Sequence, residues 1–299
     1  MGKTVFVFSG QGAQVPGMGK SLYDNSAAAK AVFDMAERIR PGTLHQCFEG
    51  TKEELSVTIN TQPCVFAVDL AAAAAVAEKG IRPDYVAGFS LGEIAAIAFA
   101  GMLSYDDAFR LVCKRAEVMD QAANEQKGAM AAVMKLTPAA VEAICSEFRQ
   151  AYPVNYNSPA QTVVAAAENE IDALCAKVKE AKGKAVKLAV SGAFHSPFMN
   201  SAAAAMEEYL RTVELRSPEI PVYSNYTAQP YAGDYKSLVA AQVNHPVKWQ
   251  TMVENLVQQG ADRFIEVGVG KTLTGLIRKI NAEVTAVNIE TKEGLDALQ

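Results

Sequence analysis

The sequence has little of three things that would point to particular protein classes: positive charge, paired cysteines and long apolar runs. Its 299 residues carry 28 Lys and Arg against 33 Asp and Glu, which gives a net charge of -5 and an isoelectric point near 5.4. Proteins that bind nucleic acid usually show a basic balance or a basic stripe. The composition therefore argues against nucleic acid as the main partner.

Cysteines are few and scattered. They are odd in number and show no CxxC spacing: Cys47, Cys64, Cys113, Cys145 and Cys175. A disulfide framework or a structural zinc site would need paired, closely spaced cysteines. We expect neither a disulfide framework nor a metal, and we expect the protein to lie in a reducing cytoplasm.

Apolar runs are short. The alanine-rich stretch "VDLAAAAAVAEKG" is interrupted by charge well before the ~20 apolar residues that a membrane span needs. The opening "MGKTVFVFSGQG" is too brief for the apolar region of a signal peptide and predicts a buried strand instead. We expect a compact soluble protein that does not contact membranes.

Short apolar runs alternate with helical patterns in the first third of the chain. The patterns predict strands at 4–8 and 85–89 and helices at about 26–40 and 63–80. This alternation is typical of a parallel sheet covered by helices. Two later runs, at 220–225 and 263–270, are expected to rejoin that sheet, so the fold class is α/β.

The order of elements changes from about residue 129. Thr137 and Pro138 begin a predicted helix as its N-cap and first residue. The expected elements are a strand at 129–136, a helix at 137–148, strands at 154–157 and 162–167, a helix at 170–182 and a strand at 185–190. This βαββαβ order is that of the ferredoxin-like unit. We therefore expect residues 124–192 to form an inserted subdomain, and residues 1–123 and 193–299 to form the large catalytic domain.

The stretch "GFSLGE" places Ser90 between Gly88 and Gly92. A predicted strand precedes it and a predicted helix follows, which is the setting of a nucleophile elbow. Glycines at 88 and 92 would let the helix approach its own strand closely. The N–H of Leu91 at the helix N-terminus can stabilise an oxyanion when Ser90 attacks a carbonyl. The alternative is that Ser90 simply caps the helix.

A serine nucleophile needs a base, and the chain offers three histidines. His45 precedes Ser90, whereas the elbow arrangement places the histidine later in the chain. His245 precedes a proline in what we interpret as a structural turn. His195, in the loop "SGAFHSPFM", is the favoured base. No aspartate or glutamate stands out as its orienting partner, so a backbone carbonyl is an alternative.

One cation lies on the wrong face of a predicted helix. In "SYDDAFRLVCKRAEVMDQAA" the polar residues recur as one stripe, and Arg115 falls on the opposite, apolar stripe. A buried guanidinium must either extend to solvent or find an anion, and its fork suits a carboxylate. The sequence leaves open an internal salt bridge and a substrate carboxylate beside Ser90.

Two glycine-rich stretches miss the nucleotide-binding motifs. The dinucleotide fingerprint needs glycine where Val15 stands, and the Walker A motif needs glycine where Ile265 stands. Gln11 follows the first strand, where α/β proteins place ligands, although it could simply cap a turn.

Lysines gather in the expected subdomain, and a solvated face is their simplest interpretation. An acidic protein partner docked there is the alternative. They are Lys177, Lys179, Lys182, Lys184 and Lys187.

Taken together, the motifs resemble those of the malonyl-CoA:acyl carrier protein transacylases, relatives of polyketide synthase acyltransferase domains. The resemblance runs nearly end to end, through "GQGAQ", "TQP", "GFSLGE", "KRAEVMDQA", "VNYNSPAQ", "AFHSPFM", "HPVKW" and "EVGVGKTLTGL" in that order. The family pairs a large domain similar to the α/β hydrolases with an inserted ferredoxin-like subdomain.

The resemblance implies roles for particular residues. Ser90 would be the nucleophile, His195 its base and Arg115 the clamp on the malonyl carboxylate. Gln11 and the Leu91 N–H would form the oxyanion hole. The main-chain carbonyl of Gln242 would orient the histidine, and Asn157 and Phe194 would contact the substrate.

The implied reaction is a ping-pong transfer of malonyl from malonyl-CoA to the phosphopantetheine thiol of acyl carrier protein, without metal or cofactor. The sequence does not determine the oligomeric state, and a monomer is our expectation. Phe89 stands where many relatives have histidine, and Phe194 resembles the malonyl-selective version of its motif. The alternatives are an acyltransferase of a polyketide pathway, a serine hydrolase or thioesterase, and a binding module without catalysis. A hydrolase has no evident use for Arg115, and a binding module has none for Ser90 and His195.

Overall fold

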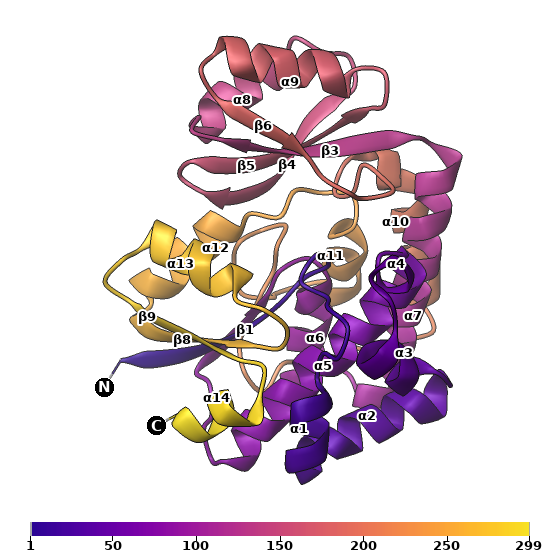
Figure 1. Ribbon diagram of the computed structural model, residues 1–299, viewed down its shortest axis with the longest axis vertical. Coiled ribbons are helices and arrows are strands. Elements are labelled where there is room, and N and C mark those ends of the chain that lie inside the picture. The colour runs from indigo at the N-terminus through magenta and orange to yellow at the C-terminus, as the bar shows by residue number, and fades with distance from the viewer. Residues whose placement is uncertain (1, 299) are drawn as a thin grey trace.

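The computed structural model describes residues 2–298 and contains two sheets (Figure 1). The larger sheet has the strand order β7-β2-β1-β8-β9, and all its neighbouring strands are parallel. Its strands are β1 (Lys3–Phe8), β2 (Tyr85–Gly88), β7 (Val222–Tyr223), β8 (Ala261–Val267) and β9 (Thr285–Ile289). The expected strands rejoin this sheet, and the edge strand β9 was not foreseen.

Helices cover both faces of the parallel sheet because β1 is apolar on both faces. Phe6 and Phe8 pack in one core cluster with the first helix layer, and Val5 and Val7 pack in another with the second layer. The first layer holds α2 (Ala27–Ile39), α5 (Thr58–Glu78), α6 (Leu91–Phe99), α7 (Tyr105–Glu125) and α10 (Asn200–Leu210). The second layer holds α12 (Trp249–Gln258) and α13 (Thr272–Ile280).

Shorter helical segments complete the fold. They are α1 (Lys20–Asn25), α3 (Thr43–Glu49), α4 (Lys52–Leu55), the 3₁₀ turn η1 (Pro197–Met199), α11 (Tyr235–Ala241) and α14 (Lys292–Ala297).

Helix α5 begins at Thr58, earlier than expected, and Pro63 lies inside it. Its length and apolar composition would allow it to cross a membrane, but 83% of its most apolar window is buried inside the protein. That burial is typical of a core helix.

The second sheet is antiparallel, with the order β4-β5-β3-β6. Its elements follow the expected βαββαβ order: β3 (Gly128–Met134), α8 (Pro138–Cys145), β4 (Ala151–Ser158), β5 (Gln161–Ala167), α9 (Ile171–Glu180) and β6 (Lys184–Lys187). Thr137 caps α8 as predicted, since its hydroxyl accepts from the Ala140 N–H. Strand β6 ends at Lys187, earlier than the expected 190. The Leu188 N–H still donates to the Met130 carbonyl on β3 at 2.9 Å, and Leu188 lines the central cavity.

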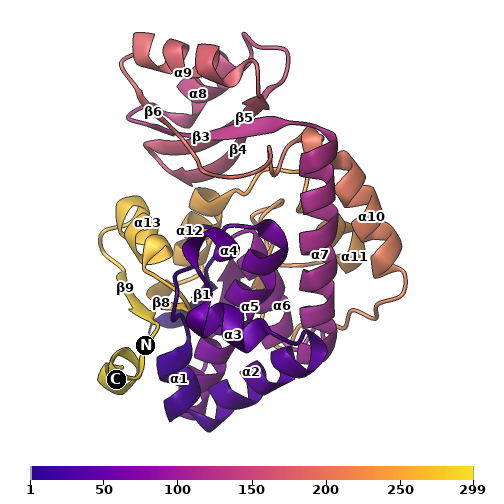
Figure 2. The same cartoon turned by 45° about the vertical axis from the view of Figure 1, so that its right-hand side comes forward.

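The antiparallel sheet lies across one end of the parallel-sheet domain, and the long helix α7 runs up to it (Figures 1 and 2). Side-chain alternation divides the two faces of β3. Ala131 and Val133 pack with α8 and α9, whereas Met130 and Ala132 face the large domain and line a cavity. The small sheet thus forms one wall of a pocket whose other wall is the end of the parallel sheet.

Candidate active site

Ser90 occupies a strained turn between β2 and α6. Its backbone angles are φ 54° and ψ -108°, a conformation that costs a non-glycine residue about 1–3 kcal/mol. A Cβ on Gly88 would lie 1.9 Å from the carbonyl carbon of Gly92. A Cβ on Gly92 would lie 2.2 Å from the carbonyl oxygen of Phe8 on β1. Both glycines are therefore required, although Gly92 is limited by the neighbouring strand rather than by its own.

Two amide side chains hold this turn in place. The Ser90 N–H donates to Asn225 Oδ1 at 2.7 Å, and Asn225 Nδ2 donates to the Gly88 carbonyl at 2.6 Å. On the other side, Gln242 Nε2 donates to the Ser90 carbonyl at 2.5 Å. These bonds satisfy the backbone groups on both sides of the strained residue, so they offset its conformational cost.

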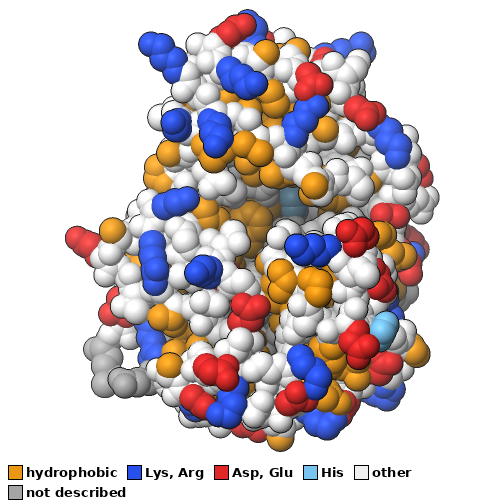
Figure 3. All heavy atoms as spheres, viewed as in Figure 1, with side chains coloured by type: hydrophobic (Ala, Val, Ile, Leu, Met, Phe, Trp, Pro, Cys, Tyr) orange, Lys and Arg blue, Asp and Glu red, His pale blue; other side chains and the backbone are white. Residues whose placement is uncertain are grey.

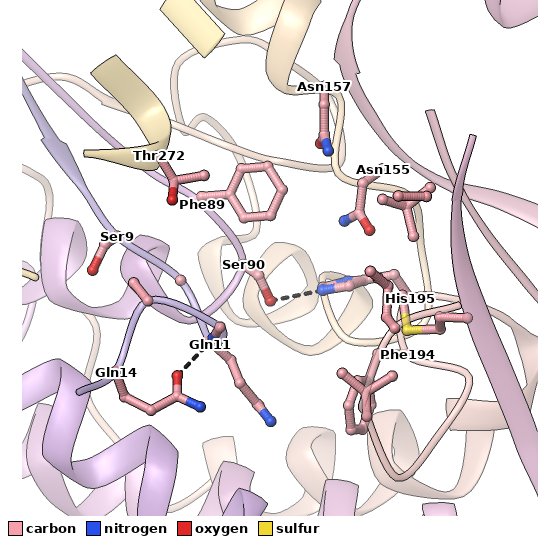
Figure 4. A pocket seen from close by; sticks show the side chains of 18 of the residues that line it. Ser9, Gln11, Gln14, Phe89, Ser90, Asn155, Asn157, Phe194, His195 and Thr272 are labelled. Carbon is pink, nitrogen blue, oxygen red and sulfur yellow. Dashed lines mark hydrogen bonds between the residues drawn. The ribbon is translucent and has the colours of Figure 1, made fainter. Parts of the chain in front are cut away.

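His195 faces the serine hydroxyl. Ser90 Oγ lies 2.7 Å from Nε2 (Figure 4). On the other side of the ring, Nδ1 lies 2.9 Å from the backbone carbonyl of Gln242. A carbonyl can only accept, so Nδ1 carries the hydrogen and Nε2 presents a lone pair to the serine. Burial, and then the charge of Arg115, lower the pKa of His195 to about 4. The imidazole is therefore neutral at pH 7, the state that a general base requires.

Arg115 is buried on the apolar face of α7, with 1% of its surface exposed. Its Nη1 donates to Gln62 Oε1 at 2.8 Å, and its Nη2 donates to Gln242 Oε1 at 2.9 Å and to Ser90 Oγ at 3.2 Å. Burial lowers its pKa to about 10, so it stays charged at pH 7. Within residues 2–298, no carboxylate pairs with Arg115 and its Nε has no hydrogen-bond partner.

The buried carboxyl of Glu93 lies behind the elbow. It accepts hydrogen bonds from the Asn225 N–H at 2.6 Å and from the Tyr231 hydroxyl. Burial raises the pKa of Glu93 to about 7, against the weaker opposing effects of these bonds and of Arg115. Glu93 thus fixes the backbone of Asn225, whose side chain accepts from the Ser90 N–H.

These groups open into a cavity of about 510 Å³ between the two sheets. Figure 3 shows the hollow from outside, with a histidine side chain visible at its base. Leu91 and Gln242 are the two residues assigned to the site from sequence that do not line this cavity. The other six line it: Gln11, Ser90, Arg115, Asn157, Phe194 and His195. Leu91 is the first residue of α6, so its N–H has no partner within the helix.

The side-chain amides of two cavity residues, Gln11 and Asn157, differ in their hydrogen bonds. Gln11 Nε2 donates to Thr58 Oγ1 at 3.4 Å, so this side chain is turned toward α5. Asn157 is 7% exposed, and its Oδ1 has no partner within residues 2–298. Figure 4 shows Asn155 and Asn157 on the cavity side opposite Gln11. An amide buried without a partner in a cavity is suited to bind a polar ligand.

The arrangement combines a serine, a neutral imidazole and a buried cation that forms no ion pair within residues 2–298. Such a group of residues can form an ester on Ser90 from an acyl donor that carries a negative charge.

Comparison with known proteins agrees with this chemistry. The model of the acyl transferase domain family matches residues 5–292. The chain belongs to that family.

Similar proteins cover nearly the whole chain. A malonyl CoA-acyl carrier protein transacylase from Bacillus subtilis is 35% identical over 99% of this chain and 96% of its own. The crystal structure of a malonyl CoA-acyl carrier protein transacylase from Clostridium perfringens has a TM-score of 0.95 at 33% identity, over 98% and 95% of the two chains. A malonyl-transacylase in complex with a type II polyketide synthase acyl-carrier protein has a TM-score of 0.95 at 30% identity, over 98% of each chain.

The other histidines of this acyl transferase lie elsewhere. His45 is on the surface of α3 beside Glu49, and the ring of His245 packs at a tilt against the ring of Tyr226. Within residues 2–298, no three His, Cys, Asp or Glu side chains are grouped to hold a metal ion. The lysines of the small subdomain are exposed, and two of them form ion pairs, Lys177 with Glu147 and Lys187 with Asp172.

Sequence reasoning missed part of the site of the acyl transferase. Gln62, Glu93, Asn225 and Tyr231 were not singled out, although "TQP" and "GFSLGE" contain the first two. Polar residues within the apolar helix at 58–78 were the one available signal, because a buried amide needs partners. Nothing near Asn225 in the sequence indicates its contact with Ser90, 135 residues away.

Proposed function

We propose that this protein transfers the malonyl group of malonyl-CoA to the phosphopantetheine thiol of acyl carrier protein, through an ester on Ser90, and so supplies extender units for fatty acid biosynthesis. The observation that carries the proposal is the position of Arg115. Its charge is buried, lacks a carboxylate partner within residues 2–298 and lies 3.2 Å from Ser90 Oγ. The names of the similar proteins support the same reaction.

In the first half-reaction, Ser90 Oγ attacks the thioester carbonyl carbon while His195 Nε2 takes the hydroxyl proton. The Gln242 carbonyl stabilises the resulting imidazolium through Nδ1–H. Collapse of the tetrahedral intermediate breaks the carbon–sulfur bond. The imidazolium returns its proton to the departing sulfur, so CoA leaves as a thiol and His195 becomes neutral again.

In the second half-reaction, the pantetheine thiol of the carrier protein gives its proton to His195 and attacks the malonyl ester. The carbon–oxygen bond to Ser90 then breaks, and Ser90 Oγ recovers the proton. Each step uses only groups of the protein and its two substrates, so our proposal includes neither metal nor cofactor.

Other cavity residues receive roles in the same scheme. The backbone amides of Gln11 and Leu91 would stabilise the oxyanion, since both follow the carboxyl ends of neighbouring strands. Asn157 has a free amide oxygen that suits the amide groups of the pantetheine arm. Phe194 is buried beside His195 and would limit the size of the acyl group.

The groups that both half-reactions use, Ser90 and His195, contact each other within one chain, as does Arg115. We propose that the protein acts as a monomer in the cytoplasm.

The decisive experiment is to incubate the purified protein with malonyl-CoA, without carrier protein, and to measure its intact mass. We expect a malonyl adduct that is absent from Ser90→Ala and weaker in Arg115→Ala. Rapid release of free malonate without an adduct would instead indicate a hydrolase.

A further inference from the structure

A buried carboxyl on α5 is joined to the loop that follows β1. Asp69 is 0% exposed, and its Oδ1 accepts from Ser9 Oγ at 2.7 Å. Ser9 is the first residue after β1 and is itself buried. Figure 4 shows its side chain pointing away from Ser90. The Ser9 hydroxyl therefore connects the loop to a core helix and not to the reacting serine.

The loop after β8 closes over the same carboxyl. Gly268 has a φ of 117°, and a Cβ on it would lie 1.8 Å from Asp69 Oδ1. Burial raises the pKa of Asp69 well above its ordinary value, the Ser9 hydroxyl opposes that rise, and the nearby Glu266 adds to it. These effects favour the neutral acid. Within residues 2–298 the other oxygen, Oδ2, has no hydrogen-bond partner. A carboxyl buried at such a cost is bonded through its side chain to Ser9.

The loop that Ser9 begins has few other restraints. Glycines flank Gln11 at positions 10 and 12, and glycine gives the backbone more freedom than any other residue. The Gln11 side chain restrains it little, because its bond to Thr58 is 3.4 Å long. The Gln11 N–H has no acceptor within residues 2–298, so it is available to a ligand. The bond from Ser9 to Asp69 is the shorter of the two side-chain bonds that tie this loop to α5.

We propose that Asp69 is a positioning residue for the oxyanion site: it holds the Ser9 hydroxyl and thereby fixes the backbone N–H of Gln11. This inference rests on the proposed function, in which that N–H stabilises the oxyanion. A donor stabilises a developing charge most when it is already in place, so a small displacement lowers the rate more than the affinity. Asp69 does not line the cavity, so it acts through Ser9.

The test measures acylation of Ser90 by intact mass over a range of malonyl-CoA concentrations. Ser9→Ala removes the hydroxyl and keeps the rest of the loop. We expect the maximal acylation rate to fall about tenfold, and the concentration that gives half of that rate to stay within about twofold. Acetyl-CoA should show the same loss, because both donors would form the oxyanion on a thioester carbonyl.

Variants at Asp69 separate the hydrogen bond from packing. Asp69→Asn keeps nearly the same volume and the oxygen that accepts from Ser9, so we expect acylation within about threefold of wild type. Asp69→Ala removes that oxygen, and we expect a loss equal to that of Ser9→Ala. The double variant Ser9→Ala/Asp69→Ala should be no slower than either single variant, because each removes the same bond.

Ser26→Ala is the matched control. The Ser26 hydroxyl donates to Glu78 Oε2 at 2.6 Å, and neither residue lines the cavity. The substitution therefore removes a comparable bond between a serine and a carboxyl in the same domain. Because Ser26 caps α2, we expect a lower temperature of thermal unfolding and an unchanged acylation rate.

Three results would overturn the proposal. They are losses that multiply in the double variant, a loss confined to malonyl-CoA, and an Asp69→Asn variant as slow as Asp69→Ala. The last would show that the accepting oxygen is irrelevant. If Asp69→Ala does not fold, as thermal unfolding will show, Ser9→Ala and Asp69→Asn decide by their own expected rates.

The wild-type protein separates the two levels of inference. If it forms no malonyl ester, the proposed function is wrong and the role of Asp69 falls with it. If it forms the ester and Ser9→Ala forms it equally fast, only the role of Asp69 is wrong.

Discussion

The two sheets bury different kinds of side chain. The parallel-sheet domain buries four acidic or basic side chains with 1% exposure or less: Asp69, Glu93, Arg115 and Glu266. Between residues 128 and 187, by contrast, no charged side chain is buried, and the core beneath α8 and α9 is built from alanine, valine, leucine, isoleucine and cysteine.

The difference reflects two demands on buried residues: stability in the small subdomain, and chemistry as well in the large domain. Burying an ionisable group costs free energy unless it is paired, so a domain that needs only a stable core avoids it. The small subdomain follows that rule, and two of its buried polar residues, Asn155 and Asn157, line the cavity. The large domain breaks the rule around Ser90, where a buried charge and a neutral histidine are useful.

The largest expected effect is on the free energy of unfolding when a glycine in each of the two regions is replaced by alanine. Gly88→Ala would place its Cβ against the backbone of α6, which cannot yield, so we expect a loss of more than about 4 kcal/mol in the free energy of unfolding. Gly183→Ala meets the side chains of Leu136 and Val178 at 2.8 and 2.9 Å, which can move, so we expect about 1–2 kcal/mol. Urea unfolding measures both, and equal losses would contradict the contrast.

The second effect concerns Asn225, whose side chain holds the turn at Ser90 in place. Asn225→Ala removes the bonds to the Ser90 N–H and the Gly88 carbonyl, so Ser90 Oγ loses its alignment with His195. We expect the acylation rate to fall about a hundredfold while the KM for malonyl-CoA changes little. Asn255, on α12, makes a comparable bond from its side-chain amide to the Ala228 carbonyl. Asn255→Ala removes that bond and should leave the acylation rate unchanged. A parallel rise in KM for Asn225→Ala would point to general loosening instead.

The third effect is the pH dependence of acylation. The pKa of His195 is lowered to about 4 in the folded protein, so this proposed base stays neutral as the pH falls to about 5. The rate should decline only below that, whereas a histidine at its ordinary value near 6.5 would lose about thirtyfold by pH 5. The same lowering means that folding stability rises with pH between about 4 and 6.5, because the unfolded chain binds more protons there.

Single-turnover acylation by acetyl-CoA is the appropriate measurement, since this donor has no carboxyl group to titrate. If the acylation rate instead falls with a midpoint at pH 6.5, the pKa of His195 is not lowered and its imidazole is exposed to solvent.

The smallest effect tests the surface of the small subdomain. No ion pair joins Lys182 or Lys184 in the part of the chain that the structure describes, residues 2–298, and both are exposed. If an acidic carrier protein docks there, the double reversal to glutamate should raise the KM for the carrier protein several-fold and leave the KM for malonyl-CoA unchanged. Lys30→Glu, on α2, is the control. Equal effects on both substrates, or none, would exclude this surface.

Much of the fold was predictable because it depends on local pattern. The alternation of strands and helices, the βαββαβ order and the cap at Thr137 each depend on residues close together in sequence. Strand β9 was missed because "TAVNI" is short and sits at a sheet edge, where apolar patterning is weak.

The sequence alone determined which chemistry was available: a serine between two glycines, a single well-placed histidine and a cation on an apolar stripe. Only the tertiary structure decided what surrounds them. Ser90 meets His195 across 105 residues, and Arg115 meets Gln242 across 127. Contacts at such separations follow from how the sheets and helices pack. That packing, not any local pattern, places two neutral amides around Arg115 and leaves its charge free for a substrate.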